Sequence, residues 1–581
     1  MITYAYDFET FYDDECSVKV LGNRGYYSHP DFEAYMLSVV GDDGYTFCGS
    51  PRDFDWSLFN GATICAHNAA FDESLRLFGV EQGWWNDCSP AESVCTADLC
   101  AYFGIPRALK NATNWLFGTE MSKTVRDNMK GQRWETMTEE FRKEVIEYAI
   151  KDSEYCLKIW QELGPKWPER EKRVSAHTRE MMRRGLPIDE EELDKAIITL
   201  KQKVFDAEAL IPWAGEKKLL SPKAFAEECR KFGIEPPASM AIDNEECDEW
   251  MEKFGEKLPF AAAVRNYRRI NALLKKLQAM QRALIDGKYY GGLLYAGAHT
   301  RRFSGSGGNL NLQNLPRGEM FGVHLRNLIK AENGMKLVVV DLSQIEVRTV
   351  IWLSGDKKMM EVIRNTDDIY EAFGIAFGLW DKTKGSLRRE NPKLRQMLKI
   401  IGLGVLYGAT ANKVSTIAKC AVSEAANMVR IVKRTLRPVV RLWKSLDTML
   451  VAGRKDGYLQ LDLPSGNSMV YRDVKSGGGK ATVATIVKNG RPIPVRLWFG
   501  SLVENISQAL ARDIFVDRLL EVEAAGYPAI LHVHDEVVLY VPEEQAEQCL
   551  KDTVRIMSTP PNWIPDIALD AEGQIMNQYD K

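Results

Sequence analysis

The sequence predicts a multidomain protein of mixed α/β and α+β class, and three observations support this prediction. The chain has 581 residues, more than the roughly 250–300 that one hydrophobic core can serve, so we expect two to four domains. Strand-like and helix-like patterns both occur along the chain. Charge is divided unevenly, because residues 1–165 contain 14 Lys and Arg against 27 Asp and Glu, whereas the rest contains 62 against 53. The net charges of −13 and +9 indicate an acidic first part and a basic second part that could bind a polyanion.

The composition excludes several classes of protein. Hydrophobic residues make up 45% and charged residues 27% of the chain, a balance typical of globular proteins. We find no run of about 18 apolar residues, so no membrane span is expected, and the N-terminus lacks the pattern of a secretory signal. The 11 cysteines form no C-x-x-C pair, which indicates a reducing compartment such as the cytoplasm rather than a disulfide framework.

Elements at both ends of the acidic part can be placed from the sequence. Alternation over residues 2–6 predicts a strand that ends at Asp7. A second short strand is expected over 62–66, and a helical pattern runs over 139–163. A glycine and two prolines follow this helix, so we place the first domain boundary at about residue 165.

The basic part combines long helical stretches with a few strands. Charged amphipathic helices dominate 170–290, for example over 260–286, and further helices are expected over 343–455. The expected strands are an apolar run at 337–340, a β-rich stretch at 457–500 with an Asn489-Gly490 hairpin turn, and two strands over 529–541 joined by a tight turn at 534–536.

A first set of acidic residues lies in the acidic part. Asp7 and Glu9 are two positions apart and therefore share one face of a strand, while Tyr148 and Asp152 are four apart and share one face of a helix. Asp72 adds a further carboxylate. Taken singly, each acid could be an ordinary surface residue. Four carboxylates at one point would repel one another unless divalent cations neutralised them, and their oxygens suit Mg²⁺ or Mn²⁺.

A second set lies in the basic part. Asp341 ends an apolar strand and Asp535 lies in the predicted hairpin turn, 194 positions later, so only the fold can bring them together. Ser343 and Glu346 have the spacing of a helix capping box, which is an alternative to any chemical role for Glu346.

One predicted helix between these two aspartates carries a chemically mixed face. Arg395, Lys399, Leu403 and Tyr407 recur every four residues and spread over about 120° of the helix surface. The two cations could clamp a triphosphate, and the aromatic ring could stack on a base. The alternative is a solvated basic face with a buried tyrosine.

The motifs of the acidic part resemble those of the DEDD superfamily of 3′–5′ exonucleases, in its tyrosine-bearing subclass. The matching pieces are D-x-E at 7–9, N-x-x-F-D at 68–72 and Y-x-x-x-D at 148–152. The resemblance implies an RNase H-like domain over 1–165. It also implies that the four acids bind two metal ions and that Tyr148 orients the attacking water.

The motifs of the basic part resemble motifs A, B and C of the family A DNA polymerases, the DNA polymerase I family, in a compact phage-type form. The matching pieces are DLSQIEVR at 341–348, RQMLKIIGLGVLYG at 395–408, HDE at 534–536, TRRFS at 300–304, NLQNLP at 311–316 and ENISQALARDI at 504–514. The resemblance implies a right-hand polymerase domain over 170–581. Its thumb is expected over about 175–300, its palm over about 300–355 and 440–581, and its fingers over about 355–440.

The polymerase resemblance also implies roles for individual residues. Asp341 and Asp535 are expected to hold two Mg²⁺ ions, which Mn²⁺ could replace, and Glu536 to support them. Glu346 is expected to exclude a 2′-hydroxyl, and Lys399 to donate a proton to pyrophosphate. The full set of expected nucleotide-binding residues is Arg395, Lys399, Leu403, Tyr407, Gln344, Glu346 and His534, and the expected DNA-binding residues are Arg302, Gln313 and Gln508.

Two residues depart from the family pattern. Leu342 replaces the usual tyrosine of motif A, where only the backbone carbonyl is needed. Leu403 replaces the usual phenylalanine or tyrosine of motif B, which offers a flat ring or a hydroxyl beside the nucleotide sugar. Typical speed and sugar selectivity are therefore not carried over.

Together these resemblances imply a DNA-templated DNA polymerase with a 3′–5′ proofreading exonuclease. We expect it to act as a monomer on primer–template DNA and dNTPs, away from membranes, in the cytoplasm of a bacterium or a phage-infected host. A processivity factor is neither indicated nor excluded. The alternatives are a nuclease whose second half only binds nucleic acid, and a relative of the single-subunit RNA polymerases.

Overall fold

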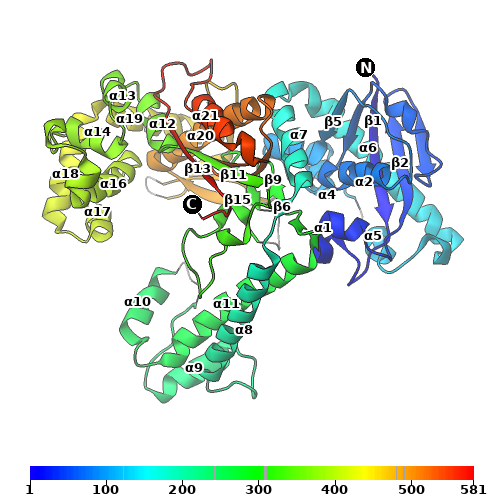
Figure 1. The fold of residues 1–581 in the computed structure, drawn as a ribbon, viewed down its shortest axis with the longest axis horizontal. Helices are drawn as coiled ribbons and strands as arrows, with labels where there is room; N and C mark the ends of the chain where they lie inside the picture. The colour runs from blue at the N-terminus through cyan, green and yellow to red at the C-terminus, as the bar shows by residue number, and fades with distance from the viewer. Residues whose placement is uncertain (122–123, 241–243, 306–309, 479–480, 489–490, 581) are drawn as a thin grey trace.

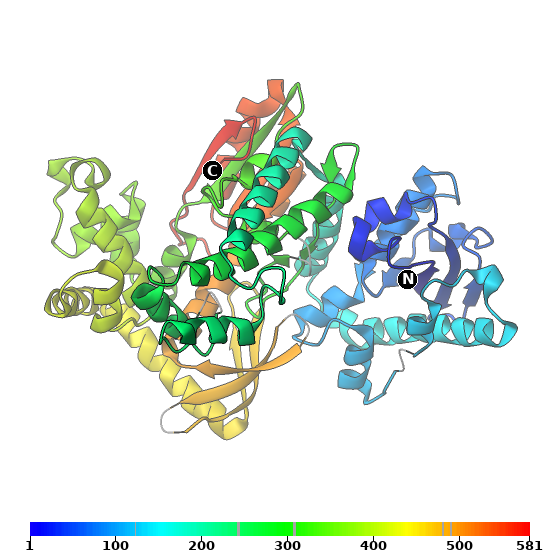
Figure 2. The same cartoon turned by 90° about the horizontal axis from the view of Figure 1, so that it is seen from below.

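The computed structural model describes residues 1–121, 124–240, 244–305, 310–478, 481–488 and 491–580. Figure 1 shows four parts: an N-terminal domain at one end, a central sheet, a lobe of helices at the other end, and an arm of helices that projects from the centre. Seen from below, the helical lobe and the N-terminal domain lie on opposite sides of the arm (Figure 2). The expected turn at Asn489-Gly490 lies outside the described residues.

The N-terminal domain is built on a five-stranded sheet with the strand order β3-β2-β1-β4-β5. β1 runs antiparallel to β2 and parallel to β4. The strands are β1 (Thr3–Thr10), β2 (Ala34–Gly41), β3 (Thr46–Gly49), β4 (Thr63–Ala66) and β5 (Glu92–Cys95). The predicted end of the first strand at Asp7 is wrong, because β1 stays paired with β2 as far as Thr10.

In the described residues of this domain, helices cover the sheet or extend from it. They are α1 (Val18–Tyr27), α2 (Ala69–Glu81), α3 (Thr96–Tyr102), α4 (Leu109–Phe117), α5 (Thr124–Met129) and α6 (Glu139–Leu163). The predicted helix over 139–163 is confirmed. It begins where the Thr138 hydroxyl accepts a hydrogen bond from the Phe141 N–H.

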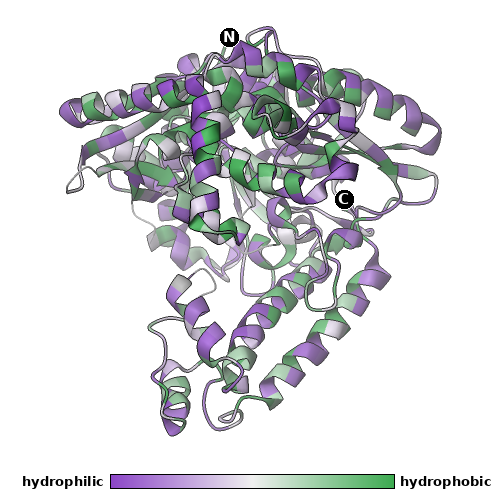
Figure 3. Ribbon diagram, turned by 90° about the vertical axis from the view of Figure 1, so that its left-hand side faces the viewer, coloured by the Kyte–Doolittle hydropathy of each residue, from purple (hydrophilic) through white to green (hydrophobic). Residues whose placement is uncertain are grey.

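The arm consists of two long helices that pack along each other and two shorter helices at its tip (Figure 1). They are α8 (Glu190–Ala209), α9 (Pro222–Lys231), α10 (Glu245–Phe254) and α11 (Pro259–Arg282). Hydrophilic and hydrophobic residues alternate along these helices (Figure 3), as expected of amphipathic helices. The tip has a small core of its own, with Trp213, Phe225 and Phe260 in edge-to-face contact.

The predicted helix over 260–286 is four residues too long. α11 ends at Arg282, because the chain then forms the hairpin β7 (Leu284–Ile285) and β8 (Lys288–Tyr289), which pairs with β6 (Leu186–Pro187). α7 (Glu169–Arg184) precedes β6 and packs against both β5 of the N-terminal domain and β16 of the central sheet.

The central sheet has four strands in the order β16-β17-β11-β18. These are β11 (Met335–Leu342), β16 (Ala529–Val533), β17 (Glu536–Pro542) and β18 (Ala571–Met576). Helix α21 (Ala546–Met557) packs on the sheet, and α12 (Ile345–Leu353) packs against α20 (Phe499–Ala524). The apolar run at 337–340 is thus confirmed as a strand that is hydrogen-bonded on both sides.

The helical lobe and a second sheet lie between α12 and α20 in the chain. The lobe comprises α13 (Lys357–Arg364), α14 (Ile369–Ala376), α15 (Leu387–Glu390), α16 (Pro392–Leu406), α17 (Ala411–Ala418), α18 (Val422–Thr435) and α19 (Arg437–Asp456). The second sheet comprises β12 (Tyr458–Asp462), β13 (Ser468–Ser476), β14 (Thr482–Lys488) and β15 (Arg491–Leu497), and it packs against α19.

The largest hydrophobic core is continuous across the boundary expected near residue 165. It joins Cys100 and Leu157 of the N-terminal domain to Val340 and Phe515 around the central sheet. The N-terminal domain and the part around the central sheet therefore pack directly against each other and share a hydrophobic core. Within the described ranges, no helix is both long and apolar enough to span a membrane.

Candidate functional site

The central sheet brings together the two aspartates that lie 194 positions apart in the sequence. In the pairing of β11 with β17, Asp341 lies opposite Glu536. The Leu342 N–H donates a hydrogen bond of 3.1 Å to the backbone oxygen of Asp535. Burial is the main cause that raises the pKa of Asp535 to about 7, and the negative charge of Asp341 adds to it. A second acid beside Asp535 thus favours a proton or a cation at this edge of the sheet.

Glu536 is buried under this edge and is held by two groups. The Tyr579 hydroxyl donates a hydrogen bond to Glu536 Oε1, and Arg326 Nη1 lies 3.8 Å from the same oxygen. Tyr579 and Arg326 thus fix the Glu536 carboxylate at the start of β17, which agrees with a supporting role for this carboxylate. Neither Tyr579 nor Arg326 was expected from the sequence, because each reaches Glu536 from a distant part of the chain.

The turn after Asp341 shows that the capping-box interpretation of Glu346 is wrong. Gln344 has a left-handed backbone (φ 46°) and is the N-cap of α12, and no side chain caps the helix there. Ser343 therefore lies one position before the cap, outside the register that a capping box requires. The side chain of Glu346 is left for other contacts.

Glu346 connects three elements beside the two aspartates. Its carboxylate forms an ion pair with Arg302 and accepts a hydrogen bond of 3.2 Å from the Tyr407 hydroxyl. Its backbone oxygen accepts a hydrogen bond of 2.8 Å from the hydroxyl of Ser507 in α20. The next residue of α20, Gln508, is half-buried and donates a hydrogen bond of 3.2 Å to Glu504. The structure thus gathers residues that the sequence analysis took from four separate motifs.

Gln313 holds the β16–β17 hairpin that carries Asp535. Its side-chain oxygen accepts a hydrogen bond of 3.0 Å from the His534 N–H, and its Nε2 donates one of 2.5 Å to the His532 oxygen. His534 has a left-handed backbone with φ 58°. Because Gln313 is buried, its amide braces the turn from inside the protein.

Helix α16 presents the mixed face that the sequence predicted. Arg395 pairs with Asp368, Lys399 is exposed, and Leu403 is half-buried against the main core. The helix ends at Leu406, so Tyr407 is its C-cap residue and points to Glu346. This face is therefore neither fully solvated nor fully buried.

The N-terminal domain joins the acids of the first set on β1, α2 and α6. Asp7 and Glu9 lie on β1, Asp72 lies in the first turn of α2, and Tyr148 and Asp152 lie on α6. The Phe8 N–H donates a hydrogen bond of 3.2 Å to Asp72 Oδ1 and so ties α2 to β1.

The pKa values of all four carboxylates are raised, and for Asp7 and Glu9 the neighbouring acids add to the effect of burial. Burial is the main cause for each; in addition, the negative charges of the neighbouring acids hold the pKa of Asp7 well above its ordinary value and that of Asp152 helps to raise Glu9 to about 8. Burial also raises the pKa of Asp72 to about 7 and that of Asp152 to about 6. The acids thus share one electrostatic environment, as the motif spacing predicted.

Arg126 on α5 was missed by the sequence analysis. Its positive charge lowers the pKa values of Glu9, Asp72 and Asp152, against the raising effect of burial. The only signal in the sequence was a cation within a strongly acidic part, which does not by itself identify a site.

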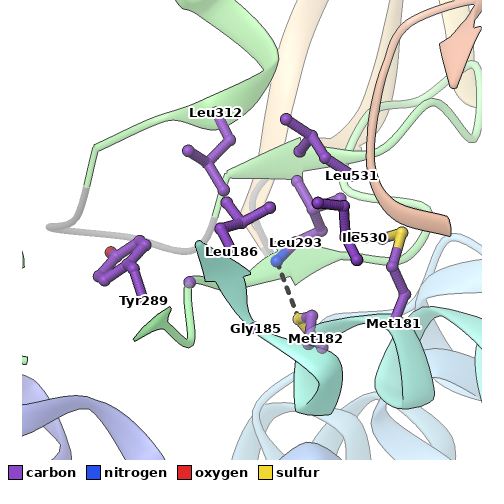
Figure 4. A pocket seen from close by; sticks show the side chains of 10 residues that line it. Met181, Met182, Gly185, Leu186, Tyr289, Leu293, Leu312, Ile530 and Leu531 are labelled. Carbon is purple, nitrogen blue, oxygen red and sulfur yellow. Dashed lines mark hydrogen bonds between the residues drawn. The ribbon is translucent and has the colours of Figure 1, made fainter. Parts of the chain in front are cut away.

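Among the described residues, no group of three or more His, Cys, Asp or Glu side chains is arranged so that it could hold a metal ion as it stands. A separate small cavity of about 10 Å³ lies between α7, β9 (Leu293–Leu294) and β16 (Figure 4). It is lined by apolar side chains such as Met181, Leu293 and Leu531 and has room for no more than a single water molecule, so it belongs to the core.

Comparison with known proteins shows that this chain is similar to DNA polymerases. Residues 190–461 match the model of DNA polymerase family A. The DNA polymerase of Bacillus phage SP02 is 25% identical, and the match covers 100% of both chains. The thermostable DNA polymerase I of Thermus filiformis is 30% identical over 45% of this chain and 29% of its own length.

A similar fold is found among solved structures. The POL domain of Pol1 from M. smegmatis, in complex with DNA primer–template and dNTP, matches with a TM-score of 0.70. The match covers 100% of this chain and 95% of that chain, at 20% sequence identity. At this identity the likeness concerns the fold alone.

Proposed function

We propose, from the premise that this chain belongs to DNA polymerase family A, that it extends a DNA primer on a DNA template and removes nucleotides from the primer 3′ end at a second site. One observation carries the polymerase part: the β11–β17 pairing brings Asp341 beside Asp535, next to the linked side chains of Glu346, Arg302 and Tyr407. In this assignment the arm is the thumb, the helical lobe up to α18 forms the fingers, and the two sheets with α12, α19, α20 and α21 form the palm.

The residues at both sites fit divalent cations. Asp341 and Asp535 offer hard oxygen ligands, and burial together with the negative charge of Asp341 raises the pKa of Asp535. In the N-terminal domain, Asp152 Oδ1 is buried and accepts no hydrogen bond from the described part of the chain. We propose that Asp341 and Asp535 hold Mg²⁺ at one site and that Asp7, Glu9, Asp72 and Asp152 hold it at the other. Bound there, Mg²⁺ or Mn²⁺ would activate an attacking oxygen and neutralise phosphate charge.

The remaining residues of the polymerase site bind and select the nucleotide. Arg395 and Lys399 bind the triphosphate, and Lys399 supplies a proton to the leaving pyrophosphate. Glu346 occupies the space that a 2′-hydroxyl would need. Tyr407, whose hydroxyl donates a hydrogen bond to Glu346, guards the template-base position. Gln344, Leu403 and His534 complete the nucleotide-binding set.

The DNA and the exonuclease reaction are assigned to residues in the same way. Arg302 and Gln508 contact the minor groove, where acceptor positions are similar for all correct pairs. In the N-terminal domain, Tyr148 orients the attacking water. This part of the proposal depends on the assembly of Tyr148 and Asp152 with the acids of β1 and α2.

A primer-extension assay tests the proposal against its alternatives. The protein is given a primer–template with dNTPs, then with NTPs, in Mg²⁺ and in EDTA. A DNA polymerase extends only with dNTPs and only with the metal, an RNA polymerase relative prefers NTPs, and a nuclease with a binding module degrades without extending. Asp535→Ala and Asp72→Ala assign each activity to its own site.

A further inference from the structure

The guanidinium of Arg395 is held on two sides by residues of α14 and its cap. Its Nε donates to the carboxylate of Asp368, in an ion pair whose two side chains are 20% and 16% exposed. Its Cζ lies 5.1 Å from the centre of the Tyr370 ring. One edge and one face of the planar group are therefore occupied by protein.

Asp368 is itself fixed in place. Its Oδ1 is the N-cap acceptor of α14 and receives a hydrogen bond of 2.9 Å from the Tyr370 N–H, while its Oδ2 receives Arg395 Nε. Tyr370 is buried, with 5% of its surface exposed. The carboxylate and the ring thus form a rigid frame at the start of one helix that receives a side chain from another.

This frame leaves the other edge of the guanidinium available. Within the described residues, Arg395 Nη1 and Nη2 have no hydrogen-bond partner in the protein. These two groups form the fork that binds a phosphate through two parallel hydrogen bonds. An arginine held through its Nε and its face keeps that fork in one orientation, at a low entropic cost on binding.

We propose that Asp368 and Tyr370 are positioning residues that aim the Nη groups of Arg395 at the triphosphate of the incoming nucleotide. The proposal rests on the proposed function of Arg395. The opposing view is that Asp368 blocks Arg395, because its negative charge competes with the phosphates for the same cation. The two views predict opposite effects of removing the carboxylate.

The experiment measures kcat and KM for a dNTP in single-nucleotide extension. For Asp368→Ala we expect KM to rise roughly 10- to 150-fold, the range for loss of a charge-assisted hydrogen bond. Asp368→Asn has one oxygen where the carboxylate has two, so it can keep either the cap of α14 or the bond to Arg395 Nε, and its KM should rise less than that of Asp368→Ala. Tyr370→Leu keeps apolar volume without the ring, and KM should rise roughly 2- to 30-fold.

Two controls separate positioning from a general loss of structure. Asp356 is the N-cap of the preceding helix, α13, and its Oδ1 accepts a hydrogen bond of 3.0 Å from the Met359 N–H. Asp356→Ala removes this cap and does not touch Arg395. Its KM should stay within twofold of the wild type. In an Arg395→Ala background, Asp368→Ala should have no further effect on KM, because Asp368 would act only through Arg395.

The proposal is overturned if Asp368→Ala lowers KM or leaves it unchanged, or if its effect adds in full to that of Arg395→Ala. A wild-type protein that fails to extend any primer would refute the proposed function instead. In that case equilibrium binding of a fluorescent N-methylanthraniloyl-dATP decides the positioning role: weaker binding by Asp368→Ala supports it, and unchanged binding refutes it.

Discussion

Replacement of Glu346 tests most directly how this chain would choose its sugar. The structure removes the capping alternative, since Gln344 is the N-cap of α12, so the substitution costs no cap. It does cost an ion pair and a hydrogen bond to Tyr407, with the side chains of Glu346 and Arg302 30% and 24% exposed. For a pair so accessible to solvent we expect a loss of about 1 kcal/mol in the free energy of unfolding.

The effect on selectivity should be larger than the effect on stability. A hydroxyl is close in size to a methylene, and a pocket discriminates one such group by roughly 10- to 200-fold. Glu346→Ala should therefore reduce the ratio of kcat/KM for a dNTP over its NTP by that factor, with slower synthesis because Arg302 and Tyr407 lose their common partner. The assay is single-nucleotide incorporation with both sugars, beside urea unfolding.

Glu346→Gln separates volume from charge in the same assay. The amide keeps the bulk that would exclude a 2′-hydroxyl but weakens the ion pair with Arg302. We expect its sugar selectivity to stay near that of the wild type while synthesis slows. The steric argument is refuted if Glu346→Ala leaves the dNTP/NTP ratio unchanged, or if Glu346→Gln lowers it equally.

Three further expectations follow from other parts of the molecule. Asp341→Ala should abolish extension but leave Mg²⁺-dependent 3′ degradation of single-stranded DNA, and Asp7→Ala should do the reverse; loss of both activities in either folded variant would contradict two separate sites. Leu403→Tyr should reduce discrimination against dideoxynucleotides roughly 10- to 150-fold, because a hydroxyl near the triphosphate could replace the missing 3′-hydroxyl, and an unchanged ratio in single-turnover incorporation would remove Leu403 from the active site. Burial alone would raise the pKa of Glu171, but Arg512 at 2.6 Å holds this pKa far below the ordinary 4.5. The carboxylate therefore contributes stability above pH 4.5, and this contribution is lost as the pH falls below 4.5. Glu171→Gln should flatten this part of the pH dependence in urea unfolding, and an unaltered slope would argue against the ion pair as its source.

Motif residues and regular elements were predictable because their signals are local. The helix over 139–163 and the apolar strand before Asp341 follow from periodicity within one segment. The strand end near Asp7 was misplaced because pairing with β2, and not the local pattern, decides where β1 stops. Likewise the start of α12 depends on the left-handed backbone of Gln344, and the residue type glutamine does not predict that conformation.

The contacts that organise the sites could not be predicted from the sequence, for a different reason. Glu346 meets Arg302 and Tyr407 across 44 and 61 positions of the chain, and Asp368 meets Arg395 across two helices. Each is one pair among many possible pairs of opposite charge or of donor and acceptor. Only the packing of the lobe, the central sheet and α20 selects them.

Gln313 shows how such a contact changes the expected role of a residue. The family resemblance assigns it to DNA binding, whereas the structure buries it and uses its amide to hold the hairpin around His534. Gln313→Ala would leave the His534 N–H and the His532 oxygen without this partner. We expect a loss of about 1–3 kcal/mol in the free energy of unfolding.

The hairpin role and the DNA-binding role can be separated by comparison with Gln508→Ala. Gln508 is half-buried, and among the described residues its side chain is bonded only to Glu504 of the same helix, so its replacement should weaken primer–template affinity with little change in stability. If Gln313 braces the hairpin, Gln313→Ala should lower stability and kcat, since the turn that carries Asp535 is no longer fixed, while the Kd for primer–template DNA changes little. The measurements are urea unfolding, DNA binding by fluorescence anisotropy and the extension rate. Unchanged stability together with weakened DNA binding would show instead that Gln313 contacts the DNA, and that the bonds to His532 and His534 contribute little to the hairpin.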